Sequence, residues 1–443
     1  MVNCWKSGSA DRFVHHASSR LLHATAAPES PTWPLRYTKS TVSKVFLFCA
    51  ALSTVLICTS GYSQSHLINS VDRDALNAAA DALCSRQIAM LGESPTHGDG
   101  HTTAFKVALV EQLIDQCGFN SVLFEASHYE FINLNRRLRM HQPVAASDVL
   151  SAVGGLWEFD REFQPLASFL LAKASEGTVF LGGLDDQLGQ RGQDYANIAM
   201  VSELTSLLPN RERLPCSLAL HKRIYYEYTD TSPYSRSDRQ QIADCLSEIK
   251  RANTANRYPG KEVKIERQEM VAAAQRCIDR DFASDSAATV GRDRSMFRNF
   301  KWLVRQQPTT PKIIIWSATV HIAKQGDPTW GDRSGTNFGS LVHKKYGRRA
   351  FSLGFSALGG SYKGIGKHEV QDMPAAPGNS VEAQAFRGTH SDATFIDQTR
   401  LAGMGIVPGA FFRHSYQTLQ WSAFLDGVVV FRQEFPPRDA LKK

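Results

Sequence analysis

A glutamate and a histidine stand close together directly after a short apolar segment. Residues 87–98 read QIAMLGESPTHG, and residues 88–91 have the composition of a buried strand that leads into Glu93 and His97. A carboxylate beside an imidazole suits proton transfer near neutral pH, because the acid fixes the tautomer of the ring and raises its basicity. We therefore take His97 as the candidate general base and Glu93 as the residue that orients it.

Ionisable side chains also follow three other apolar segments. The four residues that stand at the ends of expected strands are Glu93, Glu125, Asp185 and His321. The carboxyl ends of parallel strands meet at one edge of a sheet, and ligands bind at that edge in open α/β proteins. The sequence thus predicts that these four side chains share one rim.

The residues of this rim can be given roles in hydrolysis. Glu125 is a second candidate partner for His97, and His321 could protonate a leaving group or bind a developing oxyanion. Arg292 or Lys106 could add positive charge there, and a well-placed donor of this kind typically stabilises a transition state by a few kcal/mol. Structural alternatives stay open, because acids at strand ends can cap the following helices and the basic residues can form ion pairs.

Metal binding is a competing reading of the same segment. His97 and His101 are four residues apart, so on a helix they would share a face, and Glu93 or Glu125 could complete an open metal site. The HExxH pattern is absent, and two glycines in residues 98–100 disfavour a helix between the histidines. We keep a His97/His101 metal site as the alternative.

Other functional classes lack their signatures. No GxSxG nucleophile pattern occurs, and no P-loop or dinucleotide fingerprint follows an expected strand, so we expect no nucleotide cofactor. The formal net charge is +7, but six basic and two acidic residues lie in residues 1–64, which leaves +3 for the rest. Without a basic run interleaved with aromatics, we expect no nucleic-acid partner.

Apolar strands alternate with helical segments along most of the chain. The strands expected from composition are residues 88–91, 121–124, 178–181, 312–316, 350–353 and 427–431. This pattern predicts an α/β fold with a mostly parallel sheet flanked by helices, in one domain over about residues 70–435. Residues 195–305 are rich in Arg, Glu, Gln and Ala and predict an inserted helical region. We also expect a helix to open at residues 154–163, and loops with short pieces over residues 357–410.

The amino-terminal part has the pattern of a targeting segment. Residues 45–58 form an uninterrupted apolar run with Lys39 and Lys44 before it, and 14 residues suit a signal sequence better than a membrane span. We expect residues 1–63 to be a disordered leader with a signal peptide or anchor. The protein would then be exported, periplasmic or secreted, and would touch a membrane only through that anchor. Five cysteines follow the leader, so at most two disulfides can form, and buried free thiols are equally consistent.

Motifs spread over about residues 72–435 resemble the erythromycin esterase family. They are Leu91-Gly-Glu93 with His97-Gly98, Lys106, Gly118-Phe119, Phe124-Glu-Ala126, Trp157 with Glu162, Gly183-x-Asp185, Arg292-Asp293-x-x-Met296, Ile315-Trp316 with His321-Ile322, Leu353-Gly-Phe355 and Phe424-x-Asp426. The resemblance implies an α/β core with a helical insertion and a metal-independent carboxylic ester hydrolase. It also implies that the first-motif histidine activates water for attack on an ester or lactone.

The resemblance leaves the substrate open. Three residues separate Glu93 from His97 where the family usually has two, and only His321 remains of the family's Trp-x-His-Asn-x-His pattern. The partner that we expect is a small-molecule ester or lactone, and the residues expected to contact it are Lys106, Trp157, Glu162 and Asp185. A non-catalytic relative that binds a polyketide, a glycan or a haem-like ligand at the same rim is the alternative.

Overall fold

The computed structural model describes residues 72–190, 194–256, 260–329, 335–364 and 369–440. All of these residues belong to one compact unit, residues 65–443. The leader predicted at residues 1–63, with its apolar run at 45–58, lies outside the described residues. No helix of the described part is both long and apolar enough to cross a membrane.

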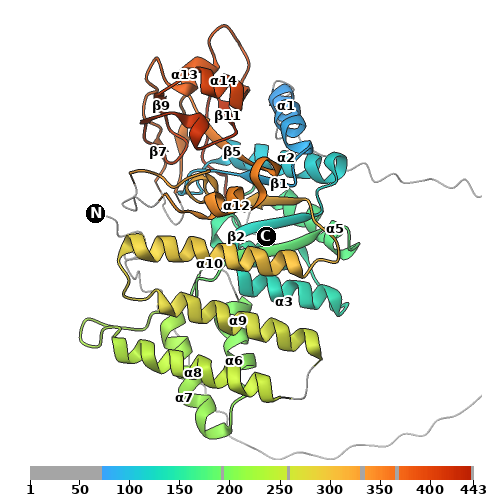
Figure 1. The fold of residues 1–443 in the computed structure, drawn as a ribbon, viewed down its shortest axis with the longest axis vertical. Coiled ribbons are helices and arrows are strands. Elements are labelled where there is room, and N and C mark those ends of the chain that lie inside the picture. Colours follow the sequence, from blue (N-terminus) through green and yellow to red (C-terminus); the bar gives the residue numbers. More distant parts are fainter. Residues whose placement is uncertain (1–71, 191–193, 257–259, 330–334, 365–368, 441–443) are drawn as a thin grey trace, which may run out of the picture. The chain divides into compact units, whose positions relative to one another are not determined.

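A seven-stranded sheet forms the centre of the described unit (Figure 1). Its strands in spatial order are β3 (Phe180–Asp185), β2 (Ser121–Ser127), β4 (Ile313–Trp316), β1 (Ile88–Leu91), β5 (Ala350–Ala357), β11 (Gly427–Phe431) and β8 (Ala393–Asp397). Six strands are parallel, and β8 runs antiparallel to β11 at one edge. The predicted α/β fold with a mostly parallel sheet is thereby confirmed.

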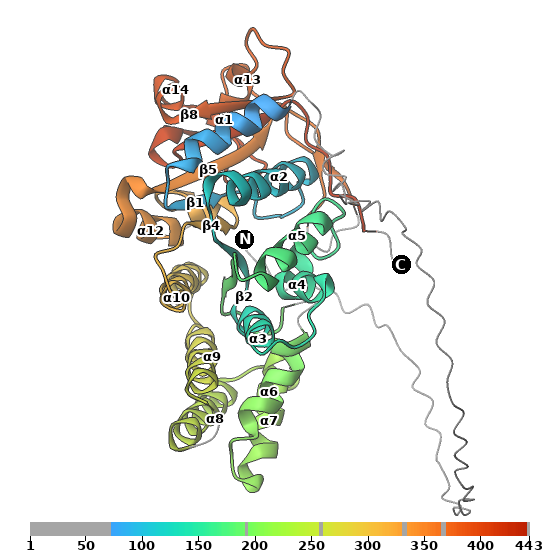
Figure 2. The same cartoon turned by 90° about the vertical axis from the view of Figure 1, so that its right-hand side faces the viewer.

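Helices bury both faces of this sheet, which explains why its strands are almost wholly apolar (Figure 2). Alternate residues of β1 enter different cores: Ala89 and Leu91 pack on one face, and Ile88 and Met90 on the other. The first face is covered by α1 (Asp72–Cys84), α2 (Gly100–Cys117), α3 (His128–Arg139), α4 (Ala146–Val153) and α5 (Gln164–Ser175). The second is covered mainly by α10 (Asp285–Arg305), α12 (Phe338–Tyr346), α13 (Val381–Ala385) and α14 (Gln398–Gly403).

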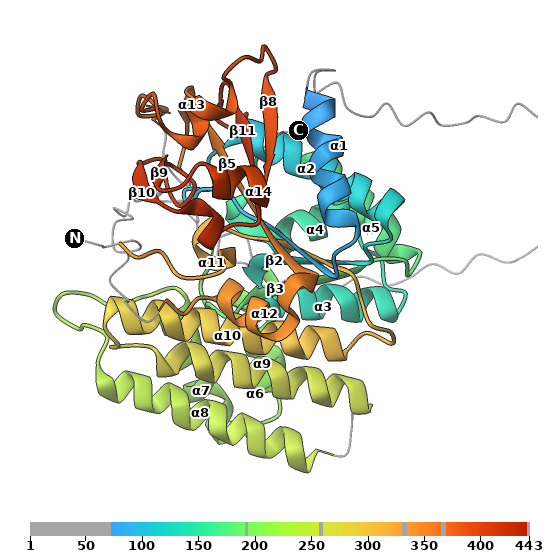
Figure 3. The ribbon, with the colours of Figure 1, turned by 45° about the horizontal axis from the view of Figure 1, so that its top comes forward.

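Between β3 and β4 the chain is helical (Figure 3). The elements there are a π-helical turn at Tyr195–Ala199, α6 (Met200–Thr205), α7 (Asn210–Ile224), α8 (Arg236–Ala255), α9 (Lys261–Asp279) and α10. Most of them share a separate apolar core that also includes Tyr129 and Ile132 of α3. One disulfide, Cys216–Cys245, joins α7 to α8, and a second, Cys84–Cys117, joins α1 to α2. Cys277 is buried as a free thiol.

Two expectations about local structure are wrong. The segment 154–163 forms a short 3-10 helix (Gly154–Leu156) followed by turns, and the α-helix begins only at Gln164. Gly154 has φ +67°, which ends α4, and Pro165 suits the first turn of α5. Residues 357–410 also contain a strand of the main sheet, β8, which composition does not reveal because only two of its five residues are buried.

Candidate functional site

The turn between β1 and α2 carries His97 (residues 92–99). Gly92 opens the turn where a Cβ would lie 2.4 Å from Thr319 Oγ1, so a side chain does not fit. His97 has φ +49°, a left-handed conformation that is uncommon for a residue with a Cβ. In this conformation its Nδ1 lies 2.6 Å from Glu93 Oε1. The longer spacing between the two residues therefore still permits a direct bond.

Glu93 is fixed by two other side chains that are fully buried. Lys106 Nζ of α2 donates to Glu93 Oε2 at 2.8 Å, and Trp157 Nε1 donates to Oε1 at 3.0 Å. Burial alone would raise the pKa of Glu93, but the Lys106 charge and the His97 hydrogen bond outweigh it, so the pKa lies below its usual value. Burial lowers the pKa of Lys106 to about 8, against the attraction of Glu93. The residue beside His97 is therefore a carboxylate at neutral pH.

The second nitrogen of His97 has no hydrogen-bond partner among the described residues. With Nδ1 directed at the carboxylate of Glu93, Nε2 is the ring nitrogen left to accept a proton. The ring packs perpendicular to that of Trp157, with 5.2 Å between centroids at an interplanar angle of 89°. This is the arrangement of a general base held by an acid on its far side.

A second cluster is built around Glu125 and His321. Glu125 of β2 accepts hydrogen bonds from Ser317 Oγ at 2.7 Å and from Ala318 N at 2.8 Å, both just beyond β4. His321 lies on the short helix α11 (Thr319–Ile322) that follows, with Nδ1 2.7 Å from Asp293 Oδ1 and Nε2 3.3 Å from Glu125 Oε1. Ser127, not Glu125, caps α3, so the capping alternative fails for Glu125.

His321 is held in the charged form. Burial alone would lower its pKa, but Glu125 and Asp293 on either side raise the pKa to about 10. A protonated ring donates to both carboxylates. Arg292 Nη1 also lies 3.0 Å from Nε2 of His321, but a protonated Nε2 has no lone pair to accept with, so this contact is not a hydrogen bond. Arg292 donates through Nη2 to Glu125 and Asp185 instead. His321 and Arg292 thus form a positive pair, and their charges hold the pKa of Glu125 well below its usual value against the effect of burial.

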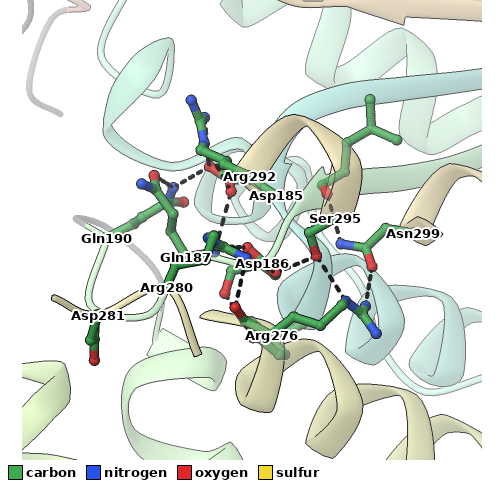
Figure 4. Close-up of polar contacts among 12 residues, drawn as sticks. Asp185, Asp186, Gln187, Gln190, Arg276, Arg280, Asp281, Arg292, Ser295 and Asn299 are labelled. Carbon is green, nitrogen blue, oxygen red and sulfur yellow. Dashed lines mark hydrogen bonds and ion pairs between the residues drawn. The ribbon is translucent and has the colours of Figure 1, made fainter. Parts of the chain in front are cut away.

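The end of β3 anchors the helix that carries Arg292 (Figure 4). Asp185 accepts hydrogen bonds from Arg292 Nη2 at 2.8 Å and from Gln190 Nε2 at 2.9 Å. The adjacent Asp186 binds Arg280, which directly follows α9, and Ser295 of α10. Both helices of the insertion that pack nearest the sheet are therefore tied to one strand end, which fixes the direction of Arg292.

The structure brings the two clusters to the same sheet edge, as expected for parallel strands. Glu93, Glu125, Asp185 and His321 all lie at the carboxyl ends of the neighbouring strands β3, β2, β4 and β1 or just beyond them. The backbone joins the clusters directly, because Thr319 N donates to Glu93 O at 2.8 Å.

The residues expected to contact a substrate are fully buried. The side chains of Lys106, Trp157, Glu162 and Asp185 are 0% exposed. Trp157 and Glu162 lie in the turns before α5, and Glu162 accepts from Arg438 Nε at 2.6 Å. Their positions suit support of the histidines and of the surrounding chain, and their contact with a substrate stays a prediction.

The alternative metal pair is not brought together. His101 uses Nδ1 toward Gln433 O at 2.9 Å and Nε2 toward Asp72 at 3.0 Å, while His97 is bonded to Glu93. In the described ranges no group of three or more His, Cys, Asp or Glu side chains is placed to hold a metal ion.

Sequence reasoning did not assign Asp293 or Ser317 to the site. Asp293 directly follows Arg292, and on α10 the two adjacent side chains reach His321 from one helix. Ser317 is the first residue after β4. Asp293 is next to an assigned residue, and Ser317 directly follows an expected strand, and these positions were the available signal.

Comparison with known proteins identifies the family of this chain. The erythromycin esterase family model matches residues 114–424. The chain belongs to the erythromycin esterase family. A Bacillus subtilis (strain 168) protein named "Putative hydrolase YbfO" is 21% identical over 348 residues, which is 71% of this chain and 75% of that protein.

Solved structures with the same fold have low sequence identity. A succinoglycan biosynthesis protein matches with a TM-score of 0.63 and 14% identity, over 84% of this chain and 95% of that one. A mutant of the erythromycin esterase EreC in its open conformation matches with a TM-score of 0.61 and 12% identity, over 84% of this chain and 96% of that one. At these identities the structures support the fold alone.

Proposed function

We propose that this protein is a hydrolase that cleaves a small-molecule ester or lactone with a water activated by His97. Membership of the erythromycin esterase family supports hydrolysis in general. The observation that carries the finer proposal is the 2.6 Å bond from His97 Nδ1 to a buried carboxylate, which leaves Nε2 without a partner in the described chain.

In the first step, Nε2 takes a proton from water as the water oxygen attacks the carbonyl carbon. The imidazolium that forms is stabilised by the carboxylate of Glu93, whose own charge Lys106 and Trp157 hold in place. General base catalysis of this kind contributes about 10²–10⁴-fold to the rate. The tetrahedral intermediate carries a negative charge on the former carbonyl oxygen.

The positive pair of His321 and Arg292 is suited to that negative charge. His321 remains protonated at neutral pH, and its longer contact, 3.3 Å from Nε2 to Glu125, is the one that the oxyanion or the departing alkoxide would replace. Collapse of the intermediate then breaks the carbon–oxygen bond and releases an acid and an alcohol, which in a lactone remain in one molecule. A ring-opened macrolide is one such product, suggested by the family's name alone.

The test is hydrolysis of a panel of esters and lactones, including a macrolide, with and without a chelator. The matched variant is His97→Asn, because Asn tolerates the left-handed backbone and can still donate to Glu93 but cannot act as the base. Activity that survives the chelator and is lost in the variant supports the proposal. Activity lost to the chelator and restored by a divalent metal would favour the metal alternative. Binding without turnover would favour a ligand-binding relative.

We also propose that the protein folds in an oxidising compartment, in keeping with the predicted export. Two disulfides form within the described chain, Cys84–Cys117 and Cys216–Cys245, and such bonds are rare in reducing cytosol. Mass spectrometry of native protein after alkylation of free thiols is the measurement. Two intact disulfides support export, and alkylation of all four of these cysteines would contradict it.

A further inference from the structure

We propose that His414 is a positioning residue for catalysis, which clamps the two ends of the turn that carries His97. This inference rests on the proposed function of His97. His414 Nε2 lies 2.7 Å from Asp99 Oδ1, at the end of the turn, and Nδ1 lies 3.4 Å from Ser94 Oγ, near its start. One imidazole thus bridges residues on both sides of His97, although it comes from a segment more than 300 positions further along the chain.

The ring of His414 is itself fixed. Its side chain is 7% exposed, and Tyr362 stacks on it with 3.6 Å between centroids and an interplanar angle of 22°. The next residue, Lys363, donates its backbone N–H to Gly98 O at 3.0 Å. At Gly98 a Cβ would meet Lys363 O at 1.8 Å, so the two backbones approach as closely as glycine permits. Two distant segments therefore press on the same short turn.

Such restraint is what the backbone of His97 requires. A residue with a Cβ at φ +49° is in a sparsely populated conformation, and strain of that kind persists only where the surroundings fix it. Among the described hydrogen bonds within the turn, only one holds the backbone of His97, from its N to Ser94 O at 3.0 Å. Asp99 is the N-cap residue of α2, yet its side chain makes no capping bond. Its carboxylate is instead used to hold His414.

The consequence for catalysis is geometric. If the clamp is removed, the turn can relax away from the left-handed conformation, and the imidazole of His97 no longer meets Glu93 at bonding distance. A displacement of about 1 Å at a reacting group can reduce a rate by about 10²-fold. Because the hydrogen bonds of His414 go to Ser94 and Asp99 and not to His97, its loss should reduce kcat while it leaves substrate affinity nearly unchanged.

The experiment compares three variants of the full-length protein. His414→Leu removes both bonds, and His414→Gln retains a donor at the position of Nε2 for Asp99. The matched control is His343→Leu, since His343 is also a mostly buried histidine that bonds to a serine, with Nε2 2.8 Å from Ser352 Oγ, but it lies on α12. The first measurement is kcat and KM for each variant. The second is hydrogen exchange of the amides in residues 92–102, which needs no activity.

We expect kcat of His414→Leu to fall about 10- to 100-fold with KM within about threefold, and His414→Gln to recover most of the loss. Exchange in residues 92–102 should quicken in His414→Leu alone. Unchanged exchange there, or an equal fall of kcat in His343→Leu, would overturn the clamp. If exchange quickens in His414→Leu but the wild type hydrolyses no ester, the clamp on the turn stands and the proposed function is refuted.

Discussion

The two histidines at the sheet edge differ in how many acids surround them. His97 has one carboxylate, Glu93, and that carboxylate is shared with Lys106 and Trp157. His321 lies between two carboxylates, Asp293 and Glu125, which raise its pKa to about 10. One ring therefore keeps a free nitrogen, and the other keeps its proton. In the proposed mechanism the neighbours thus give the same side chain opposite roles, base in one cluster and acid or cation in the other.

The largest expected effect on kcat comes from replacing His97, the proposed base. His97→Asn keeps the backbone conformation and the bond to Glu93, but it has no nitrogen that can take a proton. We expect kcat for ester hydrolysis to fall by about 10³-fold or more, with KM little changed. Steady-state kinetics of the purified variant is the measurement. A loss smaller than tenfold would show that His97 is not the base.

Loss of the positive partner should cost somewhat less. His321→Gln keeps a neutral donor in place of the imidazolium, so the oxyanion loses a full charge. We expect kcat to fall by about 10²-fold while substrate binding persists. Arg292→Lys is a poor control, because Arg292 also binds Asp185 and Glu125 and its replacement would disturb both. Wild-type rates in His321→Gln would show that the cluster around His321 has only a structural role.

Replacing Asp293, one of the two acids beside His321, should make the two histidines more alike in charge. Asp293→Asn can still accept from Nδ1–H, but it removes a negative charge that raises the pKa of His321. A lower pKa means that the protonated form is lost at lower pH, so the alkaline limb of the kcat profile should move toward neutral pH. A pH–rate profile of the two proteins measures this shift. If the alkaline limb does not move, His321 takes no part in the reaction.

The positive charge of His321 should also affect how the free energy of unfolding depends on pH. The folded-state pKa of about 10 lies above the ordinary value of 6.5, so this group stabilises the fold fully below about pH 6.5 and ceases to do so as the pH rises through about 10. Urea unfolding across that range should show a shallower decline with pH in Asp293→Asn than in the wild type. Parallel curves for the two proteins would argue against the raised pKa.

The smallest effect on activity is expected far from the edge. Cys216 and Cys245 join α7 to α8, with a sequence separation of 29 residues, and neither helix contributes a side chain to the two clusters. Replacement of both by Ala should cost about 2–4 kcal/mol of stability but leave kcat within about twofold. Thermal unfolding and steady-state kinetics of the double variant test both parts. A large fall in kcat would show that the helical region takes part in the reaction.

The sequence was informative where chemistry follows a strand in the chain, and much less so where two distant segments meet. The Glu93/His97 pair and the acids at the ends of β2 and β3 follow from local pattern and from the parallel order of strands. The partners of His321 and Glu162, Asp293 and Arg438, lie 28 and 276 positions away and depend on packing that periodicity does not encode. The buried position of Trp157 likewise depends on turns that the sequence predicted as a helix.

Rescue of a cavity variant by free imidazole tests the central claim most directly. His97→Gly suits the left-handed backbone at φ +49° and leaves space beside Glu93 for imidazole from solution. If His97 is the general base, added imidazole should restore hydrolysis in proportion to its neutral form, so the rescue should grow as the pH rises through the pKa of imidazole. A rescue that follows the imidazolium instead, or a His97→Gly variant as active as the wild type without imidazole, would contradict the assignment of His97 as the base.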